Sequence, residues 1–401
     1  MIPVEEARDI ILSHIDRLPK EKVVLDSVLG RYLAEDIVSN RDIPPWDNSA
    51  MDGYALHHGD IKSPKTRLRV VYDLPAGLSP QGSVESGEAV RIMTGAPIPP
   101  GLDAVVKRED TIESPDEVVV LKIPQRGENI RYKGEDIREG DVVLSRGDHI
   151  GPAQVGILAS LQRLSVYCYQ MPIVAILSTG DELIEIDEEL SPGRMVTSNS
   201  YTLISLVRLS GGIPLYLGIS KDNKEDLQGC LFAAKRADLI LTSGGVSVGD
   251  YDIVKDVMSL EANHMEFWQV EMKPGKPLAF GDIQGIPTIG LPGNPVSSMI
   301  SFYQFARPAI LKMMGARNLL LPRVVARIKS PIRKKPDRRH YIRGVLEKDG
   351  PCFAVSPTGP QGSGILSSMS KANCLIVIPK DKGFISEGEM VECEVIQTSW
   401  E

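Results

Sequence analysis

Strand and helix patterns alternate between residues 172 and 311, and this alternation constrains the fold more than any other feature of the chain. Apolar runs predict strands at 172–178, 213–217, 238–242 and 286–290, and helical spacing of apolar residues predicts helices at 199–209, 224–235, 251–260 and 295–311. Such alternation is typical of a mostly parallel sheet with helices on both faces. The sequence therefore predicts a central three-layer α/β domain.

The segments on either side of this region follow a β pattern. Short β pieces alternate with turn residues from Pro44 to about residue 150, which predicts a mostly antiparallel β-rich domain. Helices are predicted from Pro3 to Leu18 and after Pro152. A C-terminal β domain, a barrel or a sandwich, is predicted from strands near 323–330, 341–347, 351–355, 374–379 and 390–396. We therefore expect a multidomain fold of the α/β plus β class for the 401 residues.

Composition excludes several classes of protein. The formal net charge of −8 disfavours nucleic acid and anionic membranes as partners, and no apolar run approaches the ~18 residues of a membrane span. Five cysteines without a C-x-x-C pair, together with an acidic first segment, predict a cytoplasmic protein with reduced thiols. Zinc-binding histidine motifs, the P-loop and the dinucleotide glycine motif are all missing from the sequence.

Three loops with glycine or proline follow predicted parallel strands. They are Ser178-Thr179-Gly180-Asp181-Glu182, Ser243-Gly244-Gly245 with the residues after it to Asp250, and Pro292-Gly293-Asn294-Pro295. Ligands bind beyond the carboxyl ends of parallel strands, so all three loops are expected to face one crevice and to offer backbone N–H groups to an anion. Asn294 and Pro295 fit an N-cap and a first helical residue. One such loop could be an ordinary turn, but three on neighbouring strands favour a binding site.

Carboxylates in these loops are hard ligands that suit Mg²⁺ beside phosphate. Glu182 and Asp252 are the stronger candidates, and Asp181 and Asp250 the weaker ones. N-capping of the following helices is the alternative role for all of them.

Basic residues gather in two places. Lys273 and Lys276, in the stiff segment K-P-G-K-P, could clamp a small dianion or belong to a solvated turn. The run 323–343 holds nine Lys or Arg against Asp337 alone, so the other 380 residues carry −8 − 8 = −16. This run could be a solvated β edge, but its charge is expected to support an anion site near the C-terminal domain.

Two further loops, 47–55 and 91–97, are either functional or tight structural corners. Together with the segments above they resemble the molybdopterin molybdenumtransferase family, which includes bacterial MoeA and the C-terminal domain of gephyrin. The resemblance covers essentially the whole chain and rests on PPWDNSAMDGYA, RIMTGAPIP, GENIRYKGEDI, STGDEL, TSGGVSVGDYD, KPGKP, GLPGNPVSS and SSMSKANCLIV. The sequence departs from some members at Gln269, where they carry a basic residue, and from many members at Asp250-Tyr251, where they carry Glu followed by a small residue.

The resemblance implies insertion of molybdate or tungstate into adenylylated molybdopterin, with Mg²⁺-dependent release of AMP. It implies an elongated homodimer whose active site lies between the α/β domain of one subunit and the β-rich region of the other. Contacts with the molybdopterin adenylyltransferase and with cofactor-accepting apoenzymes are also implied. The implied domains are a linker (1–45 with 141–165), a β-rich domain (46–140), an α/β domain (166–318) and a C-terminal β domain (319–401).

The family motifs also assign roles to single residues. The implied catalytic residues are Asp52, Thr94, Glu182, Asp252, Lys273 and Lys276, with Glu182 and Asp252 as metal ligands. The implied substrate-binding residues are Arg131, Asp136, Ser178, Thr179, Gly180, Ser243, Gly244, Gly245, Pro292, Gly293, Asn294, Pro295, Arg343 and Ser368. Asp52 and Thr94, with Arg131 and Asp136 nearby, would belong to the partner-subunit side of the site.

Two alternative functions use the same α/β domain. A molybdopterin adenylyltransferase would not need the DNSAMDGYA and SSMSKANC motifs of the flanking β regions. A non-catalytic scaffold of the gephyrin type would be expected to carry additional domains and a long linker.

Overall fold

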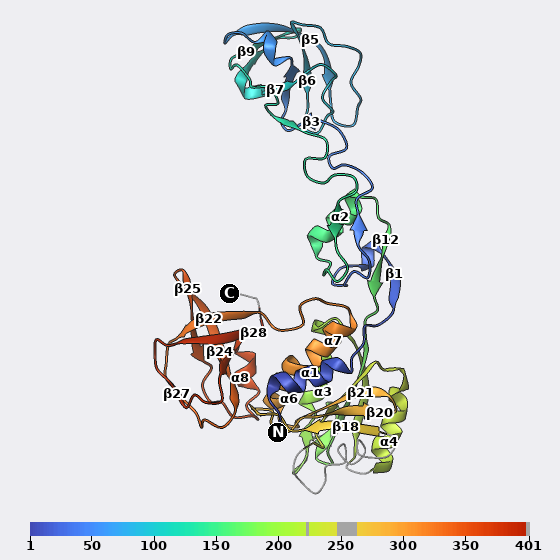
Figure 1. Ribbon diagram of the computed structural model, residues 1–401, viewed down its shortest axis with the longest axis vertical. Helices are drawn as coiled ribbons and strands as arrows, with labels where there is room; N and C mark the ends of the chain where they lie inside the picture. Colours follow the sequence, from blue (N-terminus) through green and yellow to red (C-terminus); the bar gives the residue numbers. More distant parts are fainter. Residues whose placement is uncertain (222–223, 247–262, 398–401) are drawn as a thin grey trace.

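The computed structural model describes residues 1–221, 224–246 and 263–397. The molecule is elongated: the β-rich part around β5, β6 and β7 occupies one end, and the large α/β part and the C-terminal β part lie together at the other (Figure 1). The segment that carries α2 (Pro152–Ser160) and β12 (Ser165–Tyr169) lies between the two ends. Within the described residues, no helix is long and apolar enough to cross a membrane.

The α/β part is built on a mixed sheet of six strands. In spatial order these are β16 (Ile213–Ser220), β13 (Ile173–Thr179), β17 (Leu239–Ser243), β21 (Ile286–Leu291), β20 (Ala279–Ile283) and β18 (Asn263–Trp268). The first four are parallel, as the sequence predicts. The last two pair antiparallel and extend the sheet. The central strands β13 and β17 are buried along almost their whole length, which explains their continuous apolar runs.

Helices cover this sheet at the places that the apolar spacing indicates. They are α3 (Ser198–Leu209), α4 (Lys224–Ala233) with η4 (Ala234–Arg236), α6 (Pro295–Ser301), the π-helical turn η5 (Phe302–Ala306) and α7 (Arg307–Met313). The helix predicted at 295–311 is thus one continuous helical stretch with a π turn in its middle. The helix predicted at 251–260 lies outside the described residues.

The β-rich end is a second six-stranded sheet. Its spatial order is β7 (Ala104–Lys107), β4 (Gly53–Leu56), β6 (Glu88–Ile92), β5 (Thr66–Leu74), β9 (Glu117–Val120) and β8 (Thr111–Glu113). All neighbours are antiparallel except β5 and β6. The short elements of this end are η2 (His58–Asp60), η3 (Arg108–Asp110), and the pair β3 (Asn48–Ser49) with β10 (Ile130–Arg131). Apolar side chains on both faces of the sheet are buried, which gives this end its own core.

The connecting segment is assembled from pieces far apart in sequence. β1 (Lys20–Val24) pairs with β12, and β2 (Ile37–Val38) pairs with β11 (Val142–Leu144). The turn η1 (Leu25–Ser27) follows β1. Helix α2 begins at Pro152, and the Gln154 side chain accepts the Gly151 N–H at 3.1 Å, which satisfies one exposed donor of its first turn.

Helix α1 (Val4–Ser13) packs elsewhere. The resemblance assigns it to the linker domain, but Val4, Ala7 and Ile11 are buried in the α/β core beside α7 and η5. It also ends five residues earlier than the sequence predicts, at Ser13, and the chain continues past it to Pro19 without helix.

The C-terminal part is a closed barrel. Its ring runs β24 (Arg339–Asp349), β25 (Cys352–Pro357), β22 (Arg323–Ile328), β28 (Met390–Val395) and β26 (Cys374–Ile378), and β26 returns to β24. The short strands β23 (Ile332–Arg333) and β27 (Phe384–Ile385) pair beside it, and α8 (Ser367–Ser370) precedes β26. One strand, β19 (Met272–Lys273), pairs with β24 and so joins the barrel to the α/β part.

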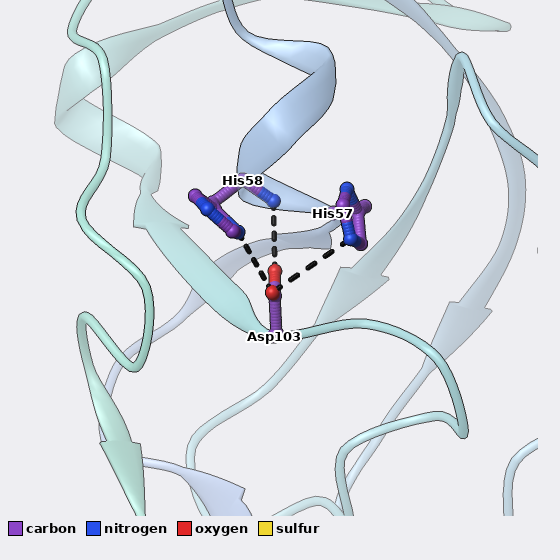
Figure 2. A group of neighbouring side chains, drawn as sticks. All are labelled: His57, His58 and Asp103. Carbon is purple, nitrogen blue, oxygen red and sulfur yellow. Dashed lines mark hydrogen bonds and ion pairs between the residues drawn. The ribbon is translucent and has the colours of Figure 1, made fainter.

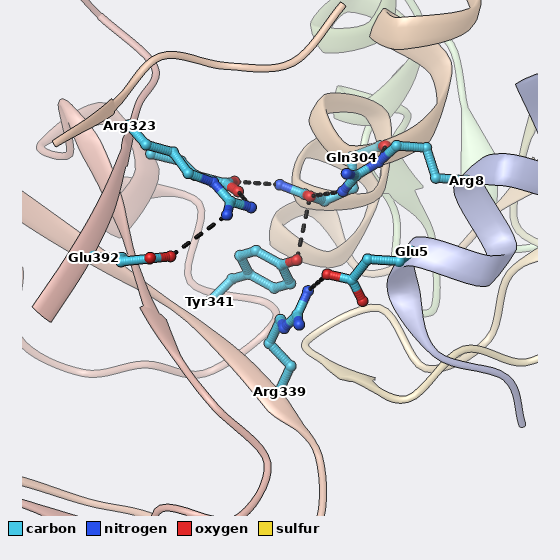
Figure 3. Close-up of polar contacts among 8 residues, drawn as sticks. Glu5, Arg8, Gln304, Arg323, Arg339, Tyr341 and Glu392 are labelled. Carbon is cyan, nitrogen blue, oxygen red and sulfur yellow. Dashed lines mark hydrogen bonds and ion pairs between the residues drawn. The ribbon is translucent and has the colours of Figure 1, made fainter.

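A buried polar network fastens the barrel to the rest of the molecule (Figure 3). Gln304, on the π-helical turn, accepts from Arg8 Nη2 at 2.9 Å and from the Tyr341 hydroxyl at 3.2 Å. Its Nε2 donates to Glu394 Oε2 at 2.5 Å, and Arg323 pairs with the other oxygen of Glu394 at 2.9 Å. One glutamine therefore connects helix α1 with two strands of the barrel.

Candidate active site

A cavity of about 630 Å³ lies at the carboxyl edge of the parallel strands. All three loops named from the sequence line it, which is the arrangement that a parallel sheet predicts. The predicted residues among its lining are Ser178, Thr179, Gly180, Glu182, Ser243, Gly244, Gly245, Pro292, Gly293, Asn294 and Pro295.

Glycine is required where the loops come closest. Gly244 has φ +97°, and a Cβ there would lie 2.6 Å from the carbonyl oxygen of Thr179. Its N–H donates to Leu291 O at 3.0 Å, which ties the β17 loop to the end of β21. Any larger residue would push two neighbouring loops apart and change the shape of the cavity.

The start of α3 contributes lining residues that were not predicted from the sequence. Thr197, Ser198 and Asn199 line the cavity, and Asn199 Nδ2 donates to Ser243 Oγ at 2.8 Å and to Gly293 O at 2.7 Å. Asn199 thus joins α3 to both other loops. The run of short polar residues at 197–200, typical of a helix start, was the signal available in the sequence.

Buried hydroxyl groups hold the Ser178–Glu182 loop against the start of α3. Ser178 Oγ lies 2.8 Å from Ser200 Oγ, which lies 2.8 Å from Thr197 Oγ1, and all three residues are buried. The Thr179 hydroxyl differs, because it is buried and finds no hydrogen-bond partner among the described residues. A buried polar group without a partner is costly, and a polar ligand in the cavity could supply one.

Glu182 is the carboxylate that the first loop brings to the cavity. Its oxygens lie within 2.7 Å of the point where a Cβ on Gly180 would stand, and Gly180 has φ +149°. The carboxylate therefore folds back over the loop glycine and lies on the cavity wall. Asp252, the second predicted metal ligand, and Asp250 lie outside the described residues.

The helix behind the third loop starts as the sequence predicts. Asn294 is the N-cap of α6 and Pro295 its first residue, although the Asn294 side chain makes no capping bond within the described part of the chain. The carbonyl of Asn294 accepts from Ser298 N at 2.9 Å. Instead of a side-chain cap, the Val296 N–H donates to Ser363 O of the C-terminal part at 3.1 Å.

The K-P-G-K-P segment lies beside the cavity, and only Pro277 of this segment is among the described lining residues. Lys273 is exposed and stands opposite His340 in the β19–β24 pair. Lys276 is half-buried, and its carbonyl accepts from Val270 N at 3.0 Å. The lysines therefore lie where the α/β part meets the barrel.

Arg343 and Ser368 come together in the barrel. Arg343 is 1% exposed, and its Nε donates to Ser368 Oγ at 3.0 Å while Nη2 donates to Gly362 O at 3.0 Å. Burial lowers the pKa of Arg343 to about 10. The loop that Arg343 holds extends to Gly364, which lines the cavity and which the sequence analysis did not name. An arginine in the barrel thus positions one wall of the α/β cavity.

The other four predicted residues lie at the far end of the molecule. Asp52 and Thr94 are in direct contact, with the backbone N–H and the hydroxyl of Thr94 both donating to Asp52 Oδ1 at 2.7 Å. These bonds lower the pKa of Asp52. Arg131 is exposed on β10, and Asp136 is exposed five residues further along the chain, where its N–H donates to Ile43 O. Strand β3, which pairs with β10, and strand β6, which ends two residues before Thr94, lie at the opposite end of the molecule from β21 and α6, whose connecting loop lines the cavity (Figure 1).

Five of the nine cations in the basic run 323–343 form ion pairs, which reduces the positive field that the sequence indicates. Arg323 pairs with Glu392 and Glu394, Arg327 with Asp349, Lys329 with Glu347, Arg338 with Asp337, and Arg339 with Glu5. Their acidic partners mostly lie on other strands or, for Glu5, on α1, where local sequence does not reveal them. Arg343 is the member of the run that is buried among neutral donors and carbonyls near the cavity.

Three family profiles match the chain in succession. They are the MoeA N-terminal region (domain I and II) at residues 2–161, the probable molybdopterin binding domain at 175–312, and the MoeA C-terminal region (domain IV) at 325–396. Molybdopterin molybdenumtransferase from Haemophilus influenzae is 38% identical over 98% of both chains, and that from a Nostoc species is 37% identical over 98% of this chain and 93% of its own. The crystal structure of the molybdopterin biosynthesis MoeA protein from Pyrococcus horikoshii superposes with a TM-score of 0.84 at 32% identity, over 98% of this chain and 100% of that one. The fold class predicted from the sequence is confirmed by this similarity, and the chain belongs to the molybdopterin molybdenumtransferase family.

Proposed function

We propose that this protein inserts molybdenum into molybdopterin, taking adenylylated molybdopterin and molybdate as substrates and releasing AMP. The observation that carries the proposal is the cavity of about 630 Å³, in which three loops converge at the carboxyl edge of the sheet. Relatives over the full chain length bear the name molybdopterin molybdenumtransferase.

The cavity suits a ligand with phosphate and many polar groups. Glycine loops and helix starts favour anions. The N–H groups of Gly180, Gly244 and Val296 already donate to protein carbonyls, so the other N–H groups of these loops would have to contact the anion. The buried hydroxyl of Thr179 and the side chains of Ser198 and Asn199 add hydrogen-bonding groups to the cavity lining. These groups would hold the ligand rigidly, so that binding positions the reacting atoms.

The residues present fit a magnesium ion. Mg²⁺ in phosphate sites takes one or two carboxylates and completes its shell with phosphate oxygens and water. Glu182 supplies one carboxylate on the cavity wall, and Asp252 is proposed as the second. When bound, the ion would neutralise phosphate charge during AMP release. The loops would orient the phosphates beside it.

Molybdate is proposed to bind where the barrel meets the α/β part. Arg343 and Ser368 hydrogen-bond to each other and to the loop that extends to Gly364. Lys273 and Lys276 lie on the K-P-G-K-P segment, which connects the α/β part to the barrel. Cationic donors that are already in place stabilise a dianion without further reorganisation. Lys273 and Lys276 would supply further positive charge to the molybdate.

Asp52, Thr94, Arg131 and Asp136 are proposed to act from a second subunit. They belong to or adjoin the β-rich part, which lies at the opposite end of the molecule from the α/β part, so a head-to-tail pair of elongated chains would bring them to the cavity (Figure 1). The homodimer can be measured by sedimentation. Inactive Asp52→Ala and Glu182→Ala chains should regain activity when mixed, because a mixed dimer then contains one intact site. Contacts with an adenylyltransferase and with recipient apoenzymes are proposed as the steps before and after.

The test is an assay of AMP release by purified protein with adenylylated molybdopterin, Mg²⁺ and either molybdate or tungstate. Oxyanion-dependent AMP release is expected. Adenylylation of molybdopterin from ATP would instead identify an adenylyltransferase. Binding without either reaction would support a scaffold and overturn the proposal.

A further inference from the structure

Two adjacent histidines and an aspartate converge in the β-rich end, far from the cavity. His57 and His58 follow the last residue of β4, and Asp103 precedes the first residue of β7. Strands β4 and β7 are antiparallel neighbours with Leu56 opposite Ala104, so the residues beyond these positions meet at one edge of the sheet. Figure 2 shows both imidazole rings directed at the Asp103 carboxylate from two sides.

The contacts within this group are close and involve metal-binding atoms. His58 Nδ1 lies 2.7 Å from Asp103 Oδ2, and His57 Nε2 lies 3.8 Å from the same oxygen. The backbone N–H of His58 donates to Asp103 Oδ1 at 2.8 Å, which fixes the carboxylate. The ligand atoms of the three side chains all lie within 4.8 Å of one another. No other three His, Cys, Asp or Glu side chains among the described residues meet this condition.

We infer that His57, His58 and Asp103 form a binding site for a borderline divalent transition metal of the zinc class. Two imidazole nitrogens and one carboxylate oxygen are the ligand types that Zn²⁺ and Co²⁺ accept, whereas Mg²⁺ prefers oxygen alone. Tetrahedral bonds of about 2.0–2.1 Å separate neighbouring ligand atoms by about 3.3 Å. The present separations of 2.7 and 3.8 Å lie on either side of that value, so small side-chain rotations suffice.

Exposure allows the metal to enter and water to complete its shell. The side chains of His57 and His58 are 49% and 37% exposed, and that of Asp103 is 19% exposed. Three protein ligands leave one tetrahedral position open. The site would therefore hold a hydrated metal that ties the η2 turn to the start of β7.

Metal binding would displace ring protons and break one hydrogen bond of the metal-free site. A carboxylate only accepts hydrogen bonds, so His58 Nδ1 carries the proton that faces Asp103. The neutral His57 ring carries its proton on Nε2, because its Nδ1 accepts from Gly59 N, and the metal must displace both protons. His57 Nδ1 now accepts from Gly59 N at 3.2 Å, and that bond must give way when the ring proton moves to Nδ1. Gly59 is exposed, so water can replace the lost partner. Arg126 also faces Asp103, at 3.5 Å, but its side chain is 78% exposed and can swing away.

A second trio provides a comparison. His14 and His264 both contact Glu266 Oε1 at 3.0 Å. Unlike the ligand atoms of His57, His58 and Asp103, those of this trio do not all lie within 4.8 Å of one another. It has the same residue classes without the same convergence, so His264→Gln is a matched control.

The site is separate from Asp52 and Thr94. Asp52 precedes β4, whereas His57 follows it, so the two groups lie at opposite ends of the strand. Removal of the histidines should leave AMP release unchanged, which keeps this inference independent of the proposed function.

The experiment titrates full-length protein, freed of metal with a chelator, with Co²⁺ and then Zn²⁺. We expect one equivalent of Co²⁺ to give a visible ligand-field absorption that Zn²⁺ abolishes, and Zn²⁺ to raise the melting temperature. His57→Gln and His58→Gln should each weaken binding about tenfold or more, and His264→Gln should not. Circular dichroism without metal checks that the variants are folded. Undiminished binding by both His57→Gln and His58→Gln, loss of binding in His264→Gln, or no saturable binding by the unmodified protein would each overturn the inference.

Discussion

Asp52 and Thr94 form a two-point contact in which the backbone N–H and the hydroxyl of Thr94 both donate to one carboxylate oxygen at 2.7 Å. The two bonds lower the pKa of Asp52, the backbone bond most strongly. Their stabilising effect is therefore present above the pKa of the unfolded chain and is lost as the pH falls through the lower folded pKa. Thr94→Val removes the hydroxyl and keeps the backbone bond.

We expect Thr94→Val to raise the pKa of Asp52 toward its ordinary value and to slow AMP release about tenfold. Carboxyl NMR titration and the AMP assay measure these changes. Thr111→Val, which removes an exposed hydroxyl bonded to Arg108 O in the same part of the chain, should change neither quantity. An Asp52 titration unaffected by Thr94→Val would show that the hydroxyl bond is absent in solution.

Thr179 and Thr242 provide a matched pair. Both hydroxyls are buried without a partner among the described residues, but only Thr179 lines the cavity. Replacing either by valine should leave the melting temperature unchanged or slightly raised, because an unsatisfied polar group is removed. Thr179→Val should weaken binding of adenylylated molybdopterin about tenfold, the worth of one hydrogen bond, and Thr242→Val should not. If Thr179→Val and Thr242→Val bind adenylylated molybdopterin with equal affinity in a fluorescence titration, the ligand does not contact the Thr179 hydroxyl.

Arg343 can be tested by a change that keeps its charge. Lysine has one nitrogen and cannot reach Ser368 Oγ and Gly362 O together, as the guanidinium does. Arg343→Lys should therefore loosen the loop that ends in Gly364 and weaken molybdate binding about tenfold in equilibrium dialysis. Arg327→Lys, on the outside of the same barrel and paired with Asp349, is the control. Wild-type affinity in Arg343→Lys would mean that charge alone matters.

Much of the α/β part could be predicted from the sequence, because its signals are local. The buried strands β13 and β17 are continuous apolar runs, and the glycines that bring their loops together are needed by local backbone geometry. Strands β18 and β20 were harder to predict, since they lie around the Pro- and Gly-containing segment 273–277 and pair antiparallel at the sheet edge.

What sequence could not show depends on contacts between distant segments. Gly364 reaches the cavity only because Arg343 holds its loop. The charge of Arg323 is neutralised by Glu394, a partner 71 residues away. The separation of Asp52 from the cavity follows from the long connecting segment, whose strand pairs are closed by residues far apart in the chain.

His340 predicts a pH dependence of stability. Burial, followed by the nearby positive charge of Lys334, lowers its pKa to about 4, although Asp337 acts in the opposite direction. Below the unfolded pKa of about 6.5 the unfolded chain binds a proton that the folded protein does not accept until about pH 4, so the free energy of unfolding should fall over this range. His340→Gln should flatten this slope in urea unfolding between about pH 7 and pH 5, and His149→Gln should preserve it. An unchanged slope in His340→Gln would assign the dependence to other groups.

Gln304 offers the strongest test of how the barrel is attached. Its amide satisfies Arg8, Tyr341 and Glu394 at once, and Arg8 and Glu394 are 7% and 3% exposed. Gln304→Leu removes the side-chain partner of Arg8 Nη2, the Tyr341 hydroxyl and Glu394 Oε2, while Arg8 Nε keeps the Gln304 carbonyl and Glu394 keeps Arg323. We expect it to lower the free energy of unfolding by about 3 kcal/mol. Tyr341→Phe removes one donor and should cost about 1 kcal/mol.

The two changes should not add, because both remove the same Tyr341–Gln304 bond. The double variant should therefore lose less stability than the sum of the single variants, as measured by urea unfolding. Gln125→Leu, at an exposed position, controls for the loss of a glutamine. Strict additivity would indicate that Tyr341 and Gln304 act separately, and a small effect of Gln304→Leu would show that the barrel is held by its apolar contacts and by β19 rather than by this network.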